Sequence, residues 1–212
     1  MNRYELNERL KRVDRDAIIE LLSRHPEKDQ KIGCGVRRIE IRKTEYGSRG
    51  FQIIRLDGTE TDFSYLRCIT GKAPSVQQEV CRAFREAIKD DIIDAKERFF
   101  LLKSKNGSAP CAVSGKFILF DEGHVDHKPP MTFEVIVDTF LAGRKISYSD
   151  VPITTGADNQ VCPKLTDLKL ERRFRNYHKR VARLSFIHKS INLSQSAAYR
   201  LKPGNIEFKL DN

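Results

Sequence analysis

The chain has 212 residues, of which 39% are hydrophobic and 32% are charged. This balance excludes a disordered polar chain, and the length allows one compact domain or two small ones with a real hydrophobic core. Lysine and arginine number 39 against 29 aspartate and glutamate residues, which gives a formal net charge of +10 at pH 7. Such an excess favours a polyanionic partner, and a basic surface that serves only solubility is the alternative.

The five cysteines are scattered, and no two of them form a CxxC pair. This pattern is typical of a reduced chain, and it disfavours both a disulfide scaffold and a four-cysteine zinc site. The N-terminus lacks the apolar stretch of a signal peptide, and no segment approaches the roughly 20 apolar residues of a membrane helix. We therefore expect a cytoplasmic protein that does not contact a membrane.

Residues 1–72 are expected to form a small domain with a helix and an antiparallel sheet. Asp14 or Asp16 can cap the helix, which ends at His25-Pro26 because the residue before proline avoids the helical conformation. Short apolar runs between residues 31 and 68 then predict a meander with a turn at Gly47-Ser48. Its third strand is predicted to run through residues 63–66.

Residues 73–104 predict one long connecting helix. Ser75 and Gln78 are spaced as a capping box, and apolar residues follow at helical spacing as far as Phe100. The turn-forming segment 105–108 then marks the start of a second domain, at residues 105–212.

The second domain is predicted to open with a hairpin over residues 111–120. A helix capped by Thr132 and a loop insertion at 145–163 follow, and a basic helix then covers about residues 165–183. A short apolar strand at 184–187 leads to a final helix that carries Asn192. The predicted fold class is therefore α+β, with antiparallel sheets in both domains.

Asp126 and His127 are the residues that best fit hydrolysis of a phosphodiester. That reaction needs a base, a cation and basic side chains that hold the polyanion. A carboxylate suits Mg²⁺, and a neutral imidazole suits a base near neutral pH. Adjacent residues of a strand point to opposite faces, so a bend is needed, and Pro129-Pro130 can supply it.

The second domain resembles the HNH (ββα-metal) endonucleases in the order of its motifs. The resemblance rests on the segments 111–116 and 124–127 and on Asn192 after a short strand. It implies that Asp126 and Asn192 bind Mg²⁺ or Mn²⁺ and that His127 is the general base. His124 is a possible auxiliary residue. The family's middle asparagine would fall near Arg183, which does not match.

The basic helix offers two replacements for that middle asparagine, Asn176 and His178. His178 is accordingly a second possible auxiliary residue of the site. The alternative for both His124 and His178 is a purely structural role.

The first half resembles a second family, the DCL-like (defective chloroplasts and leaves) domains. The resemblance rests on segments 21–26, 31–35, 55–58 and 62–65, together with Cys68. It implies a module that binds nucleic acid and does not by itself imply a reaction.

Two groups of basic residues are the predicted contacts to DNA phosphates, since phosphate contacts come mainly from arginine and lysine. The alternative for both is a solvated face. They comprise Arg37, Arg38 and Arg42 in the meander, and Arg172, Arg173, Arg175, Lys179, Arg180 and Arg183 in the basic helix.

The sequence thus predicts a metal-dependent endonuclease that acts on double-stranded DNA, of the restriction type found in bacteria or phages. Cleavage of both strands would suggest a homodimer. One alternative is a non-catalytic protein that binds nucleic acid, RNA included, in which Asp126 and His127 are structural. Another is a structural zinc domain that uses His124, His127 and a cysteine.

Overall fold

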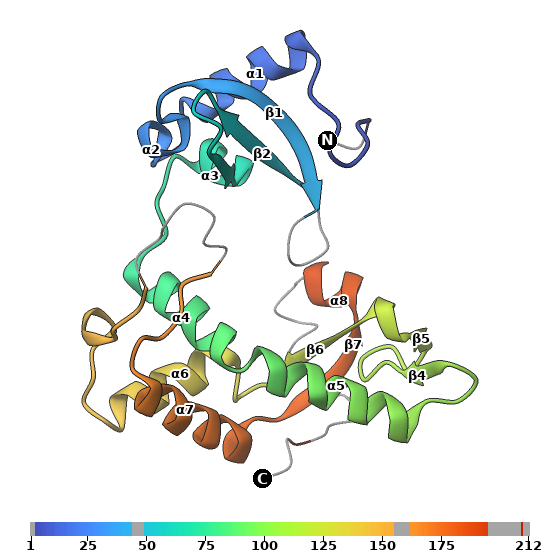
Figure 1. Ribbon diagram of the computed structural model, residues 1–212. Coiled ribbons are helices and arrows are strands. Elements are labelled where there is room, and N and C mark those ends of the chain that lie inside the picture. Colours follow the sequence, from blue (N-terminus) through green and yellow to red (C-terminus); the bar gives the residue numbers. More distant parts are fainter. Residues whose placement is uncertain (1–2, 44–48, 155–161, 195–208, 210–212) are drawn as a thin grey trace. The chain divides into compact units, whose positions relative to one another are not determined.

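The computed structural model describes residues 3–43, 49–154, 162–194 and 209 (Figure 1). The described residues divide into two compact units, an N-terminal unit up to Ser75 and a C-terminal unit within Val76–Thr154 and Pro163–Asn212. Both mix helices with antiparallel sheets, so the α+β class is confirmed at this level. The limits predicted for the domains stay a prediction.

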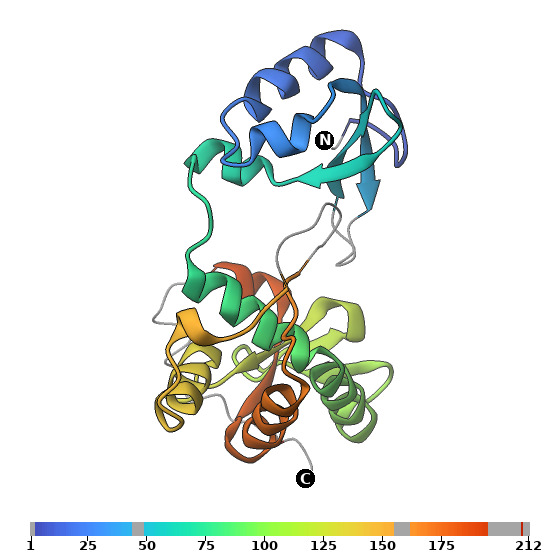
Figure 2. The same ribbon diagram turned by 60° about the vertical axis from the view of Figure 1, so that its left-hand side comes forward.

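The N-terminal unit consists of a three-stranded antiparallel sheet with helices packed on it (Figure 2). The strand order is β1-β2-β3, as expected for a meander. Alternation along β1 buries Ile39 and Ile41, which pack with Leu22 of the first helix. The elements are α1 (Arg12–Leu22), α2 (Lys28–Ile32), β1 (Val36–Lys43), β2 (Arg49–Arg55), β3 (Glu60–Phe63) and α3 (Tyr65–Thr70).

Two details of this unit differ from the prediction. The third strand ends at Phe63, and α3 begins at Tyr65. The helical conformation places Cys68 in the core of this unit. Asp14 lies inside α1 instead of capping it, and its carboxylate accepts hydrogen bonds from the Tyr4 hydroxyl and from Arg3. The predicted turn at Gly47-Ser48 lies outside the described residues.

The C-terminal unit contains helices and two separate two-stranded sheets, β4-β5 and β6-β7. The expected single connecting helix over residues 73–104 is instead two helices, α4 and α5, with a break at Ile88. The elements are α4 (Val76–Ala87), α5 (Lys89–Lys103), β4 (Ser108–Pro110), β5 (Phe117–Leu119), β6 (Gly123–His127), α6 (Phe133–Ala142), α7 (Leu168–Val181), β7 (Leu184–His188) and α8 (Lys189–Ser194).

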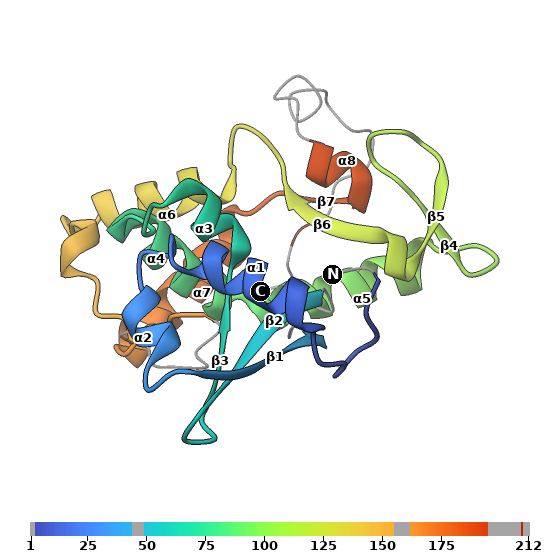
Figure 3. The ribbon, with the colours of Figure 1, turned by 90° about the horizontal axis from the view of Figure 1, so that it is seen from above.

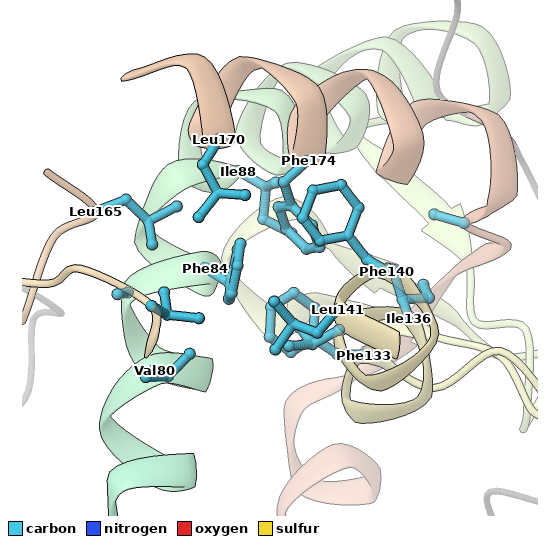
Figure 4. Close-up of a cluster of buried hydrophobic side chains, with 14 of the residues drawn as sticks. Val80, Phe84, Ile88, Phe133, Ile136, Phe140, Leu141, Leu165, Leu170 and Phe174 are labelled. Atoms are coloured by element: carbon cyan, nitrogen blue, oxygen red, sulfur yellow. The ribbon is translucent and has the colours of Figure 1, made fainter. Parts of the chain in front are cut away.

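The helices α4, α6 and α7 meet in an aromatic core (Figure 4). The ring centroid of Phe174 lies 4.4 Å from that of Phe84 and 5.1 Å from that of Phe140. Ile88, at the break between α4 and α5, is buried in the same core. Residues 76–103 therefore belong to the packing of the C-terminal unit and do not form a free connector.

The remaining elements follow local sequence signals closely. Thr132 caps α6, as predicted, through a hydrogen bond from the Val135 amide. Asp167 caps α7 by accepting from the amides of Lys169 and Leu170, which ends the loop insertion there. The hairpin is present, but its first strand is Ser108–Pro110, and segment 111–116 is its loop. In the described part of the chain, no helix could span a bilayer.

Candidate metal and nucleic-acid site

Strands β6 and β7 and helix α8 bring the predicted metal ligands into one small unit. The strands pair antiparallel, with Asp126 opposite Ser185 and His127 opposite Leu184, and α8 packs against both strands (Figure 3). The pairing requires glycine at position 123, because a Cβ atom there would lie 1.9 Å from the ring of Phe186. The strand that carries Asp126 is therefore fixed closely against β7.

Asn192 of α8 reaches back to the first strand of this unit. Its Nδ2 atom lies 3.2 Å from Nδ1 of His124. Burial lowers the pKa of His124, and the charges of Lys96 and Lys189 lower it further, so its imidazole is neutral at pH 7. The Asn192 amide then donates to Nδ1, and its Oδ1 oxygen keeps its acceptor capacity.

Asp126 lies on the same face of β6 as His124, because the two residues are two positions apart on a strand. The Asp126 carboxylate acts to raise the pKa of His124, although burial and the lysines outweigh it. His124, Asp126 and Asn192 are thus the predicted site residues that the structure gathers on one side of β6. His124 was predicted only as an auxiliary residue, and its i, i+2 spacing to Asp126 is the signal that places it here.

The donor atoms on this face fit a hard divalent cation. They are a carboxylate, an amide oxygen and one neutral imidazole, and Mg²⁺ binds through one or two such protein groups plus water and phosphate. Among the residues that the structure describes, no three His, Cys, Asp or Glu side chains form a metal cluster. Protein ligands alone would therefore not surround a cation here.

His127 lies on the opposite face of β6, against the helix α7. The expected bend is not seen within β6, where Asp126 and His127 occupy consecutive positions of the regular β6-β7 register. The Nε2 atom of His127 lies 2.7 Å from Nε2 of His178, which is fully buried beside Phe133 and Phe174. The structure therefore brings His127 and His178 together and separates both from the Asp126 face.

Both histidines of this pair are neutral near pH 7. Burial, with smaller effects from the charges of His178 and Arg85, lowers the pKa of His127 to about 3. Burial also lowers the pKa of His178 to about 4. One Nε2 must then donate to the other, and within the described residues Nδ1 of His178 has no hydrogen-bond partner.

The basic helix α7 divides into a structural part and an exposed part. Arg175 donates from Nε and Nη2 to the Asp91 carboxylate at 2.9 and 2.8 Å, and Lys179 lies 3.5 Å from Asp91 Oδ1. Asp91, on α5, is only 6% exposed. Sequence reasoning missed Asp91, because nothing local distinguishes it from the other acids of its helix.

The exposed part of α7 lines a hollow that suits an anion. Arg172, Arg173 and Arg180 are exposed. A cavity of about 490 Å³ is lined by Arg144, Arg173, Asn176, Lys179 and Arg180.

In the N-terminal unit, two of the three predicted arginine contacts are paired. Arg38 forms an ion pair with Glu40, and Arg42 lies 3.7 Å from Glu60. Arg37 is exposed and lines a separate cavity.

Comparison with known proteins identifies the N-terminal part of the chain. The family described as "Protein of unknown function (DUF3223)" matches residues 1–69. Two chloroplastic DCL proteins also match this part, one from Arabidopsis thaliana with 42% identity and one from Solanum lycopersicum with 40% identity, each over 72 residues. The chain has a DCL-like domain at its N-terminus.

The DCL-like domain is similar to a segment of a much larger protein as well. DNA-directed RNA polymerase IV subunit 1 of Arabidopsis thaliana is 40% identical over 72 residues, which are 34% of this chain and 5% of that protein. The matches to the DCL proteins span 32% of this chain and 33% or 32% of theirs. The chain therefore spans a third or less of the curated relatives that it matches.

One solved structure shares sequence with the chain. It is the solution NMR structure of an uncharacterized protein from Rhodospirillum rubrum, with 45% sequence identity and a TM-score of 0.31. The match covers 32% of this chain and 64% of that one.

Proposed function

We propose that the C-terminal unit is a metal-dependent endonuclease of the HNH type and that its substrate is DNA. The observation that carries the proposal is the contact between Asn192 of α8 and His124 of β6, on the strand face that also holds Asp126. The packing of β6, β7 and α8 together, with α6 and α7 inserted between the two strands, supports it, because the HNH resemblance implies that two metal ligands lie on the first strand and the final helix of such a unit.

Asp126 and Asn192 would hold the cation, Mg²⁺ or Mn²⁺, through carboxylate and amide oxygens. When bound, such a cation supplies charge stabilisation for the phosphate and the leaving oxygen. The hydrogen bond to His124 orients the Asn192 amide, so that Oδ1 keeps a defined direction. Lys96 and Lys189 are near enough to act on the charge of His124, and they add positive potential for a phosphate on this face.

The base remains His127, as the HNH resemblance implies. Nδ1 of His127 can accept a proton only in the tautomer whose Nε2 donates to His178, and its pKa of about 3 makes it a weak base near pH 7. His124 is the imidazole on the Asp126 face, so the two histidines require separate variants. The predicted homodimer follows from one active site per strand and stays a prediction.

The test is cleavage of plasmid and phage DNA by the full chain in Mg²⁺ or Mn²⁺, with EDTA as the blank. Asp126→Asn should abolish cleavage and leave DNA binding intact, whereas the exposed Asp121→Asn, the matched control, should cut like wild type. His127→Ala should slow cleavage by about 10²–10⁴-fold if His127 is the base. Equal cleavage by wild type and Asp126→Asn would refute the proposal.

A second function, binding of nucleic acid without catalysis, is favoured by one observation. The contact of His127 with the buried His178 is what a structural histidine would show. Salt-sensitive DNA or RNA binding without cleavage in any metal would establish this alternative. One plant relative with a DCL-like segment is named as an RNA polymerase subunit, which supports a nucleic-acid setting for either function.

A further inference from the structure

A cavity of about 420 Å³ in the N-terminal unit is lined by four arginines and one leucine. The lining residues are Arg9, Leu10, Arg12, Arg15 and Arg37. They come from the segment before α1, from α1 itself and from β1. Among the described residues that line the cavity there is no carboxylate, and the acid that contacts Arg15 of its wall is Asp16, at 3.2 Å.

Backbone hydrogen bonds fix the segment that carries Arg9. This segment runs along β1 at the edge opposite β2, where the Asn7 amide donates to the Ile41 carbonyl at 2.6 Å. The Leu10 amide donates to the Ile39 carbonyl at 2.9 Å, and the Leu10 side chain is buried. The segment is thus held like an added strand, and Arg9 is confined beside β1.

Arg15 forms the rigid part of the cavity wall. Its Nη2 donates to the Val36 carbonyl at 2.9 Å, and its Nη1 lies 3.2 Å from Asp16 Oδ1. Its Nε is buried and has no hydrogen-bond partner within the described residues. The guanidinium is therefore positioned by the protein before any ligand arrives.

The positive charges of the other three arginines are not fully neutralised by neighbouring acids. Within the part of the chain that the structure describes, the exposed side chains of Arg9 and Arg37 form no ion pair. The Arg12 side chain is 95% exposed and lies 4.0 Å from Asp16, the acid that Arg15 also contacts. Four cations facing one cavity repel each other, and an anion would relieve that repulsion.

We propose that this cavity binds backbone phosphates of nucleic acid, with Arg9, Arg12 and Arg37 as contacts and Arg15 as the fixed wall. Arginine suits this ligand because its planar guanidinium donates two parallel hydrogen bonds to phosphate. Among the described residues, no aromatic side chain lines the cavity, and because phosphate contacts carry no sequence information, we expect binding that is independent of sequence. The proposal rests on the proposed function only in taking DNA as the polymer.

The test measures binding of a short labelled DNA duplex to the full chain by fluorescence anisotropy, in EDTA and over a range of KCl concentrations. The pocket variant is Arg12→Ala with Arg37→Ala. The control is Arg24→Ala with Lys28→Ala, which removes the same charge from exposed positions of the same unit that do not line the cavity. Thermal melts of both variants establish that they fold.

The pocket variant should reduce the slope of log K against log salt by about 2, one per lost phosphate contact, and should weaken binding equally for unrelated sequences. The control should keep the wild-type slope. Equal slopes for the two variants would overturn the proposal. Because EDTA prevents cleavage, a failure here leaves the proposed nuclease untouched, and an inactive nuclease leaves this result valid.

Inorganic phosphate at constant ionic strength is the second arm of the experiment. If the polymer is the ligand, phosphate should displace little duplex from either protein. Stabilisation of wild type but not of the pocket variant by phosphate in thermal melts, together with an unchanged salt slope for duplex binding in the pocket variant, would identify a site for free phosphate and overturn the assignment to nucleic acid.

Discussion

Removal of the Asp91 carboxylate should destabilise the C-terminal unit by about 2–3 kcal/mol. Two hydrogen bonds from Arg175, at 2.9 and 2.8 Å, and the nearby Lys179 end on this buried group. A hydrogen bond to a charged group contributes about 1.5–3 kcal/mol, and breaking a buried ion pair costs about 3–5 kcal/mol. The side chains of Arg175 and Lys179 are 39% and 32% exposed, so water can solvate them after the loss, which favours a value below that range.

The assay is urea unfolding of wild type, Asp91→Ala, Arg175→Met and the double variant at pH 7, followed by circular dichroism. The midpoint of a thermal melt should fall by about 6–10 °C in Asp91→Ala. Asp91→Ala leaves the Arg175 guanidinium without its partner, and Arg175→Met leaves the Asp91 carboxylate without that partner. The double variant removes both charges, so it should lose less stability than the sum of the two single losses. An Asp91→Ala value within about 0.5 kcal/mol of wild type would show that the ion pairs of Asp91 do not stabilise the C-terminal unit.

Three further predictions follow from the packing of the C-terminal unit. The free energy of unfolding of this unit should fall by about 2 kcal/mol between pH 8 and pH 5 from His178 alone, because burial lowers the pKa of His178 to about 4, whereas the unfolded chain binds a proton there below about pH 6.5. His127 acts in the same direction. A His178→Phe variant should show a shallower pH dependence in urea titrations. Gly123→Ala should cost about 1–3 kcal/mol or abolish folding, since the new methyl group meets the Phe186 ring, and a wild-type melt would contradict this. Phe174→Ala should cost about 3–5 kcal/mol in denaturant unfolding, and a loss below about 1 kcal/mol would show that its aromatic core is not tightly packed.

The sequence was most informative where one local signal determines an element. The meander, the Thr132 cap and the short strand before the final helix with Asn192 all follow from periodicity and short-range chemistry. The end of β3 was not predictable in the same way. Tyr65 and Leu66 fit a strand by composition, and only the burial of Cys68 in the folded unit selects a helix there.

The site could be predicted in part for the same physical reason. Alternation along β6 places His124 with Asp126, and this follows from their spacing alone. The pairing of His127 with His178, 51 residues apart, depends on how α7 packs against β6. The clamp of Asp91 on Arg175 spans 84 residues and likewise lies beyond local pattern. Charge counting assigned Arg175 to DNA, whereas the structure commits its guanidinium to Asp91.

We propose that the face formed by β6 and α8 holds a catalytic cation. The most direct measurement is the single-turnover rate of DNA cleavage in Mg²⁺ for wild type, Asp126→Asn and Asn192→Ala, with Asp121→Asn as the control. We predict that the first two variants lose at least about 10²-fold in rate while binding DNA like wild type, and that the control does not. Wild-type rates in both Asp126→Asn and Asn192→Ala would show that this face holds no catalytic cation.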